Sequence, residues 1–195
     1  MLSKEVDMNR LNFACLAVLA RRPVGSSLRL ALGYRGAMSD AVALHVDEDG
    51  FFCLVAPDTY RGFVDEDWEL EQLLTHFAGQ MNAESLFIAY PGPYDTNETV
   101  VVADGHGDAP VLRQAVGAVN VGPGGLWLTD YTQLTMAAQF DDEAPTASYA
   151  IRLPIAEGRH RVDLRQLDGV PRYVLTITPL ADDGREPVSA VPWFS

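Results

Sequence analysis

Short runs in which apolar and polar residues alternate recur along most of the chain. Glycine, proline or aspartate bounds these runs, and these are the usual residues of turns between strands. The runs are SLRLALGY (27–34), SLFIAY (85–90), TVVVAD (99–104), GLWLTD (125–130), SYAIRLP (148–154), GRHRVDL (158–164) and RYVLTITPL (172–180). Many short strands of this kind favour a β-sandwich or an open barrel with about ten strands.

Two apolar segments in the first third of the chain extend this pattern. ALHVDEDGFFCLV (43–55) predicts a β-hairpin with Asp49-Gly50 in the turn. Val42, Leu44 and Val46 would share one face of its first strand, and His45 would be exposed on the other face. The run LNFACLAVLA (11–20) predicts a buried strand.

One segment has helical rather than alternating periodicity. In VDEDWELEQLLTHFAGQM (64–81), an apolar stripe recurs at helical spacing, formed by Leu70, Leu73, Leu74, Phe77 and Met81. The stripe predicts one amphipathic helix near 65–80, with Asp65 as its N-cap and Gly79 at its end. The expected fold is therefore mainly β with one helix laid against a sheet, and an α+β fold is the alternative.

Composition favours one globular domain without a membrane anchor. A chain of 195 residues that is 48% hydrophobic can bury a conventional core, so residues 1–195 are expected to form a single domain. LNFACLAVLA has ten residues, too few to span a bilayer, so no membrane association is expected. Cys15 and Cys53 lie in apolar segments, where free thiols are expected, and this favours a bacterial-type cytoplasm.

The net charge of −13 narrows the class of partner. Negative charge repels a phosphate backbone, so nucleic acid is not an expected partner. In one interpretation the charge serves solubility alone. In the other, a patch of it steers a basic protein partner onto the surface.

The stretch VVVADGHGDAP (100–110) is the strongest candidate for chemistry. Asp104, His106 and Asp108 stand at every second position, as the ligands of a small metal or acid–base site could. The loop offers at most three ligands and no second histidine lies nearby, so we interpret it as a solvated turn after a strand. A metal-assisted hydrolase with His106 and Asp104 as ligands is the alternative.

No sequence motif supports catalysis elsewhere. The chain contains no GxSxG, HExxH or GK[ST] motif, and VGPGG (121–125) lacks the lysine of a phosphate-binding loop and predicts a turn between strands. We therefore assign no catalytic residue, no cofactor and no metal. His160 shares a strand face with Val162 and Leu164, which predicts a hydrogen-bonded core histidine.

The polar face of the predicted helix is the strongest candidate for binding. At 100° per residue, Trp68 lies opposite the apolar stripe, and a tryptophan among carboxylates suits a basic partner. The alternative is that Trp68 folds back over Tyr60 or Phe63. The predicted partner-binding residues are Asp65, Glu66, Asp67, Trp68, Glu69, Glu71 and Gln72.

Arginines alternate along one later strand. Arg159, Arg161 and Arg165 share a face with Asp163 in an otherwise acidic chain. We interpret this face as solvated and internally paired. A second contact surface or an anion site is the alternative.

Residues 85–180 resemble the small bacterial β-sandwich inhibitors of the competence protein J type. The resemblance lies in the order of SLFIAY, NETVVVAD, GGLWLTD, IRLPIAEGRHRVDL and RYVLTIT, and in the phrase LPxxxGxxxV. It implies a protein that binds and silences a nuclease. No functional residue carries over, and the first 80 residues lie outside the resemblance.

These observations predict a non-enzymatic binding protein. The leading hypothesis is an intracellular immunity or inhibitor protein that occludes a basic toxin or nuclease. The metal-assisted hydrolase is the first alternative. A sugar-binding β-sandwich module that uses Trp127, Tyr131 and Tyr94 is the second.

Overall fold

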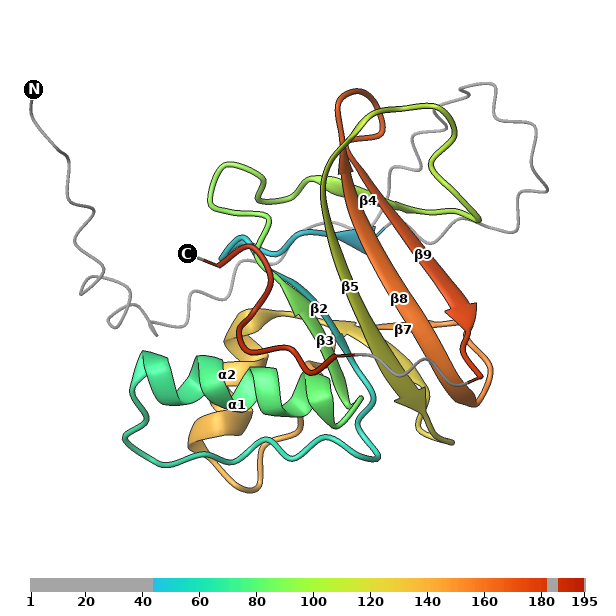
Figure 1. The fold of residues 1–195 in the computed structure, drawn as a ribbon. Coiled ribbons are helices and arrows are strands. Elements are labelled where there is room, and N and C mark those ends of the chain that lie inside the picture. Colours follow the sequence, from blue (N-terminus) through green and yellow to red (C-terminus); the bar gives the residue numbers. More distant parts are fainter. Residues whose placement is uncertain (1–43, 182–185, 195) are drawn as a thin grey trace, which may run out of the picture. The chain divides into compact units, whose positions relative to one another are not determined.

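The computed structural model describes residues 44–181 and 186–194, which form two β-sheets and two helices (Figure 1). The larger sheet has the order β1-β4-β9-β8-β5, with β1 Leu44–His45, β4 Thr99–Val102, β9 Tyr173–Pro179, β8 Gly158–Leu167 and β5 Val111–Val121. The smaller has the order β3-β2-β6-β7, with β3 Leu86–Ala89, β2 Phe52–Val55, β6 Leu126–Thr129 and β7 Ile151–Leu153. The helices are α1 Leu70–Asn82 and α2 Tyr131–Gln139.

The prediction of a mainly β fold is confirmed. The described residues contain nine strands, which form two open sheets and no closed barrel. With two helices beside them, the fold also fits the α+β alternative. The segments 11–20 and 27–34, together with Cys15 and Val42, lie outside the described residues, and so does part of the predicted domain 1–195.

A long three-stranded ladder of β5, β8 and β9 forms one side of the larger sheet. β8 pairs antiparallel with β5 on one side and with β9 on the other, and β9 pairs in parallel with β4. Val162 and Leu164 on one face of β8 are fully buried, whereas Arg161 on the other face is exposed. This alternation is the pattern predicted from GRHRVDL.

The two helices lie beside the smaller sheet (Figure 1). On α1, Leu73, Phe77 and Met81 are fully buried in the core that both sheets share. Leu70 and Leu74 belong to the same apolar stripe but are only half-buried. One side of the stripe therefore remains accessible.

The predicted hairpin over 43–55 is wrong, although its turn exists. β1 pairs with β4, and β2 pairs with β3 and β6, so the two consecutive strands belong to different sheets. The turn is closed by Asp47 N donating to Phe51 O at 2.8 Å. All four residues of β2 are buried, as in a central strand that lies between neighbours rather than in an edge hairpin.

The predicted boundaries of α1 are also wrong. The helix begins at Leu70, and Glu69 is its N-cap, because Gln72 Oε1 accepts a hydrogen bond from Glu69 N at 2.7 Å. Asp65 instead closes a local turn, in which its Oδ1 accepts from Asp67 N at 3.1 Å. The helix continues past Gly79 to Asn82, since an exposed glycine weakens a helix without ending it.

Two elements were not predicted. β5 is the longest strand, at 11 residues, but its buried face carries Ala115 and Gly117, which give little hydropathic contrast. α2 is short, with nine residues, and its N-cap is Asp130, whose Oδ1 accepts from Gln133 N at 2.6 Å.

Candidate interaction surface

Residues 65–71, called the acidic segment below, carry a dense run of exposed negative charge. Five of the seven residues are carboxylates, and all five are exposed: Asp65, Glu66, Asp67, Glu69 and Glu71. In the part of the chain that the structure describes, no arginine or histidine side chain lies within 4.0 Å of them. Their charge is therefore available to a partner.

The acidic segment is held in place by the end of α2. Val64 N and Asp65 N both donate to Ala138 O, at 2.8 and 3.3 Å. Gln139 Nε2 donates to Glu66 O at 3.0 Å. The backbone is thus fixed before any partner arrives, which lowers the entropy lost on binding.

Trp68 lies in the acidic segment but not on the helix. It precedes Leu70, so its predicted position opposite the apolar stripe of the helix is wrong. The side chain is half-buried and contacts the hydrophobic core. Among the described rings it makes no stacking contact with Tyr60 or Phe63, so that alternative is not observed either. Gln72 is exposed, and its side chain caps the helix.

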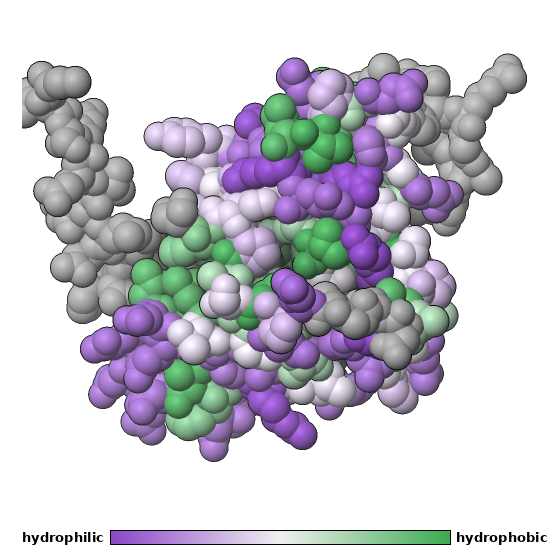
Figure 2. Space-filling model, in the orientation of Figure 1, coloured by the Kyte–Doolittle hydropathy of each residue, from purple (hydrophilic) through white to green (hydrophobic). Residues whose placement is uncertain are grey.

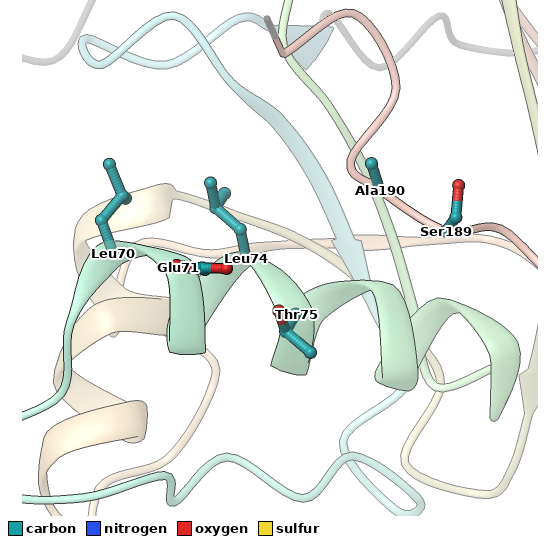
Figure 3. A pocket seen from close by; sticks show the side chains of 6 residues that line it. All are labelled: Leu70, Glu71, Leu74, Thr75, Ser189 and Ala190. Carbon is teal, nitrogen blue, oxygen red and sulfur yellow. The ribbon is translucent and has the colours of Figure 1, made fainter.

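An apolar groove begins where the acidic segment ends. It has a volume of about 390 Å³ and is lined by Leu70, Glu71, Leu74, Thr75, Ser189 and Ala190. We call it the α1 groove. Leu70 and Leu74 point to the same side of α1, the side on which the chain carrying Ser189 and Ala190 runs (Figure 3). Hydrophilic and apolar side chains accordingly adjoin one another over the left side of Figure 2, where α1 begins.

The second wall of the α1 groove is fixed by hydrogen bonds. Asn82 Nδ2 donates to Val188 O, and Val188 N donates to Asn82 Oδ1, both at 2.9 Å. Beyond Ser189 and Ala190, Val191 is buried, and Tyr90 N donates to Pro192 O at 3.0 Å. The groove is therefore preformed.

The Asp104, His106 and Asp108 loop has the form of a turn. Asp104 and Asp108 are exposed, and Gly107 adopts a positive φ of 63°. His106 is half-buried rather than solvated as predicted, and its Nδ1 is buried without a hydrogen-bond partner. Within residues 44–181 and 186–194, no group of three or more His, Cys, Asp or Glu side chains could hold a metal ion. The loop gives no geometric support to the hydrolase alternative.

Two histidine predictions are confirmed. His160 is buried, and its Nε2 lies 2.9 Å from Ala156 O, as expected of a core histidine. His45 on β1 is exposed.

Pairing within the molecule is observed on the arginine face of β8, as predicted, but the face is not solvated throughout, because Asp163 is buried. Arg165 NH2 lies 2.7 Å from Asp163 Oδ2, and Gln114 Nε2 also donates to this carboxylate. Arg159 forms a bidentate ion pair with Glu84. These contacts stabilise the sheet, whereas Arg161 on the same face is exposed.

The three aromatic residues proposed for sugar binding have different environments. Trp127 is half-buried, and its Nε1 donates to Gly124 O at 2.8 Å, within the predicted turn between β5 and β6. Tyr131 stacks on Phe51, with ring centroids 4.4 Å apart. Tyr94 is 95% exposed. They share no ring contact within the described chain, so no aromatic platform is formed.

A partly buried polar cluster around Asp95 was not predicted from the sequence. Asp95 Oδ2 accepts from Tyr173 Oη at 3.0 Å, and Asp95 Oδ1 lies 3.0 Å from Arg172 NH2. The Arg113 guanidinium lies 4.3 Å from the ring centroid of Trp193 and donates to Tyr173 Oη at 3.3 Å. Burial raises the pKa of Tyr173 to about 12. Four separate stretches of chain meet here, so no local sequence pattern predicts the cluster. Through Trp193, it anchors the C-terminal stretch against the larger sheet.

Aspartates also hold the start of α2. Asp47 Oδ2 accepts from Tyr131 N at 2.8 Å, and Asp49 Oδ2 accepts from the Thr132 hydroxyl at 3.0 Å. Burial raises the pKa of Asp47 to about 6, while hydrogen bonds from the backbone of Tyr131 and Phe51 oppose the rise. The carboxylates are used to join the β1–β2 turn to the helix, which is a structural role.

Comparisons with known proteins identify no family. No family model matches the sequence, and no curated protein matches it. One solved structure, described as crocagin biosynthetic gene J, aligns over 72% of this chain and 96% of that chain, with a TM-score of 0.43 and 9% sequence identity. A similarity of this size carries no information on function. The resemblance to competence protein J-type inhibitors remains a prediction. Separately, no helix among the described residues is long and apolar enough to cross a membrane.

Proposed function

We propose that this chain is a cytoplasmic binding protein that recognises a basic protein through the acidic segment and occludes it, as an immunity or inhibitor protein for a toxin or nuclease would. The supporting observation is the set of five exposed carboxylates within residues 65–71, without a cationic side chain within 4.0 Å in the described chain. Folding does not require this arrangement, because like charges side by side repel.

An exposed acidic patch of this kind would mainly raise the rate at which the chain associates with a basic partner. At physiological salt, exposed charges act over about 8 Å, so five carboxylates within seven consecutive residues act as one patch on an approaching cation. Such a patch raises the association rate with a basic partner and repels acidic ones. Because the segment is already fixed by Ala138 O and Gln139 Nε2, binding does not have to order it.

The test is a quantitative capture from native cell extract followed by purification of the captured protein. The variant Asp67→Lys/Glu69→Lys reverses two charges in the acidic segment. Its matched control, Asp104→Lys/Asp108→Lys, changes net charge equally at two other exposed sites. We expect the first variant to slow association with the purified partner at least about tenfold and the control to leave it nearly unchanged.

Salt provides the second arm of this test. Raising the salt concentration should slow association of the wild-type chain and have little effect on the Asp67→Lys/Glu69→Lys variant. Equal association rates for both charge variants, or a captured protein that is acidic, would overturn the proposal.

A further inference from the structure

We infer that the α1 groove receives an aliphatic side chain of the same basic partner, flanked in the partner by lysine or arginine. The inference rests on the proposed function and adds a chemical class for the bound segment. It follows from three properties of the groove: its apolar floor, its fixed walls and the sign of the charge beside it.

The floor of the groove suits one aliphatic side chain. Leu70 and Leu74 are one helical turn apart, both are half-buried, and both point to the same side of α1 (Figure 3). The other members of their stripe, Leu73 and Phe77, are fully buried. Apolar surface at this site would lose water contact only when an occupant covers it.

The walls do not have to form on binding. The hydrogen bonds between Asn82 and Val188, and the buried Val191 beyond, hold Ser189 and Ala190 opposite the helix. A preformed groove gains affinity because little chain entropy is lost when it is filled. Small side chains at Ser189 and Ala190 leave room between this wall and Leu74.

The charge beside the groove selects the occupant. Glu71 is exposed and lines it, and Glu69 and Asp67 lie immediately before Leu70. No described arginine lies within 4.0 Å of these carboxylates. An occupant with cations on either side of its aliphatic residue would pair with them, whereas an acidic occupant would be repelled.

The experiment uses the full chain and three probe peptides with blocked ends: Lys-Lys-Leu-Lys-Lys, Lys-Lys-Ser-Lys-Lys and Glu-Glu-Leu-Glu-Glu. Methyl and amide NMR shifts report the two parts of the surface separately, through the methyl groups of Leu70 and Leu74 and the amides of Glu69 and Glu71. We expect the lysine–leucine peptide to shift both sets, with at least about tenfold tighter binding than the serine peptide, because an apolar pocket discriminates by roughly that factor. The glutamate peptide should shift neither set.

Two variants control the result. Ala190→Phe adds a ring to the exposed wall of the groove and should abolish the methyl shifts while the amide shifts remain. Ala156→Phe places the same ring at an exposed position between β7 and β8 and should change nothing.

The outcomes separate the two proposals. Amide shifts of equal size with both lysine peptides, without methyl shifts, would overturn the groove inference and leave the proposed function standing. Methyl shifts with the glutamate peptide would overturn the assignment of a basic occupant. The absence of any shift with either lysine peptide would overturn both proposals.

Discussion

Gly50 lies at the point where the chain passes from the larger sheet to the smaller one. Its φ is 85°, and an added Cβ would lie 2.6 Å from Gly92 O, which is backbone and cannot move aside cheaply. We predict that Gly50→Ala lowers the free energy of unfolding by about 2 kcal/mol or more, measured by urea titration.

Gly79 supplies the matched control, because it lies exposed within α1 and an added Cβ would meet nothing within 4 Å. Gly79→Ala should raise the free energy of unfolding by about 1 kcal/mol, since alanine favours the helix. Equal effects of the two substitutions would contradict this account of the β1–β2 turn.

Asp47 should make stability depend on pH. Burial raises its pKa from 3.8 to about 6, so the folded state holds this proton more tightly than the unfolded state. The resulting stabilisation is fully present below about pH 4 and is lost as the pH rises through about 6, an effect of up to about 3 kcal/mol. Chemical unfolding at a series of pH values should therefore show a steeper loss of stability toward neutral pH in the wild type than in Asp47→Asn.

Removing a carboxylate also lowers the overall negative charge, and Asp108→Asn isolates that effect because Asp108 is exposed. This control should keep the wild-type pH dependence. If Asp47→Asn retained it as well, the buried carboxyl would not be its source.

At the scale of elements, Asp130 defines where α2 begins. Its Oδ1 accepts from Gln133 N, and its Oδ2 accepts from the Tyr149 hydroxyl. We predict that Asp130→Ala lowers the free energy of unfolding by about 1 kcal/mol through loss of the N-cap, as measured by urea titration. Tyr149→Phe removes only the second bond at a side chain that is 72% exposed, so its effect should stay below about 0.5 kcal/mol. A larger loss from Tyr149→Phe would show that the cap is not the main contribution.

Elements with strong contrast between apolar and polar positions were predictable, and others were not. The sequence of β8 alternates between apolar residues, Val162 and Leu164, and charged residues on the opposite face, so it predicts a strand. β5 has less contrast because Ala115 and Gly117 occupy half of its inner face, beside Val119 and Val121. The start of α1 was misplaced because Asp65 and Glu69 are both capable caps, and only the contact of Gln72 with Glu69 N decides between them.

At the scale of the whole molecule, contiguous features were easier to foresee than assembled ones. The acidic segment was predictable because its charges follow one another in the chain. The α1 groove was not, since Ser189 and Ala190 are held beside the helix by contacts between residues far apart in the sequence, such as the hydrogen bonds between Asn82 and Val188. The cluster around Asp95 was not predictable either, because its residues come from separate stretches of the chain. β1 and β2 pair with distant strands rather than with each other. Packing of the whole core determines this pairing, and local periodicity does not encode it.

The parallel pairing of β4 with β9 has a consequence for how the protein is made. Val100 pairs with Tyr173, and β9 also pairs with β8, so the larger sheet is incomplete until residues 173–179 have been synthesised. Pairings this distant in sequence form slowly, and a nascent chain waiting for β9 exposes unpaired strand edges. Any fragment that ends before Tyr173 would therefore be a target for chaperones and proteases.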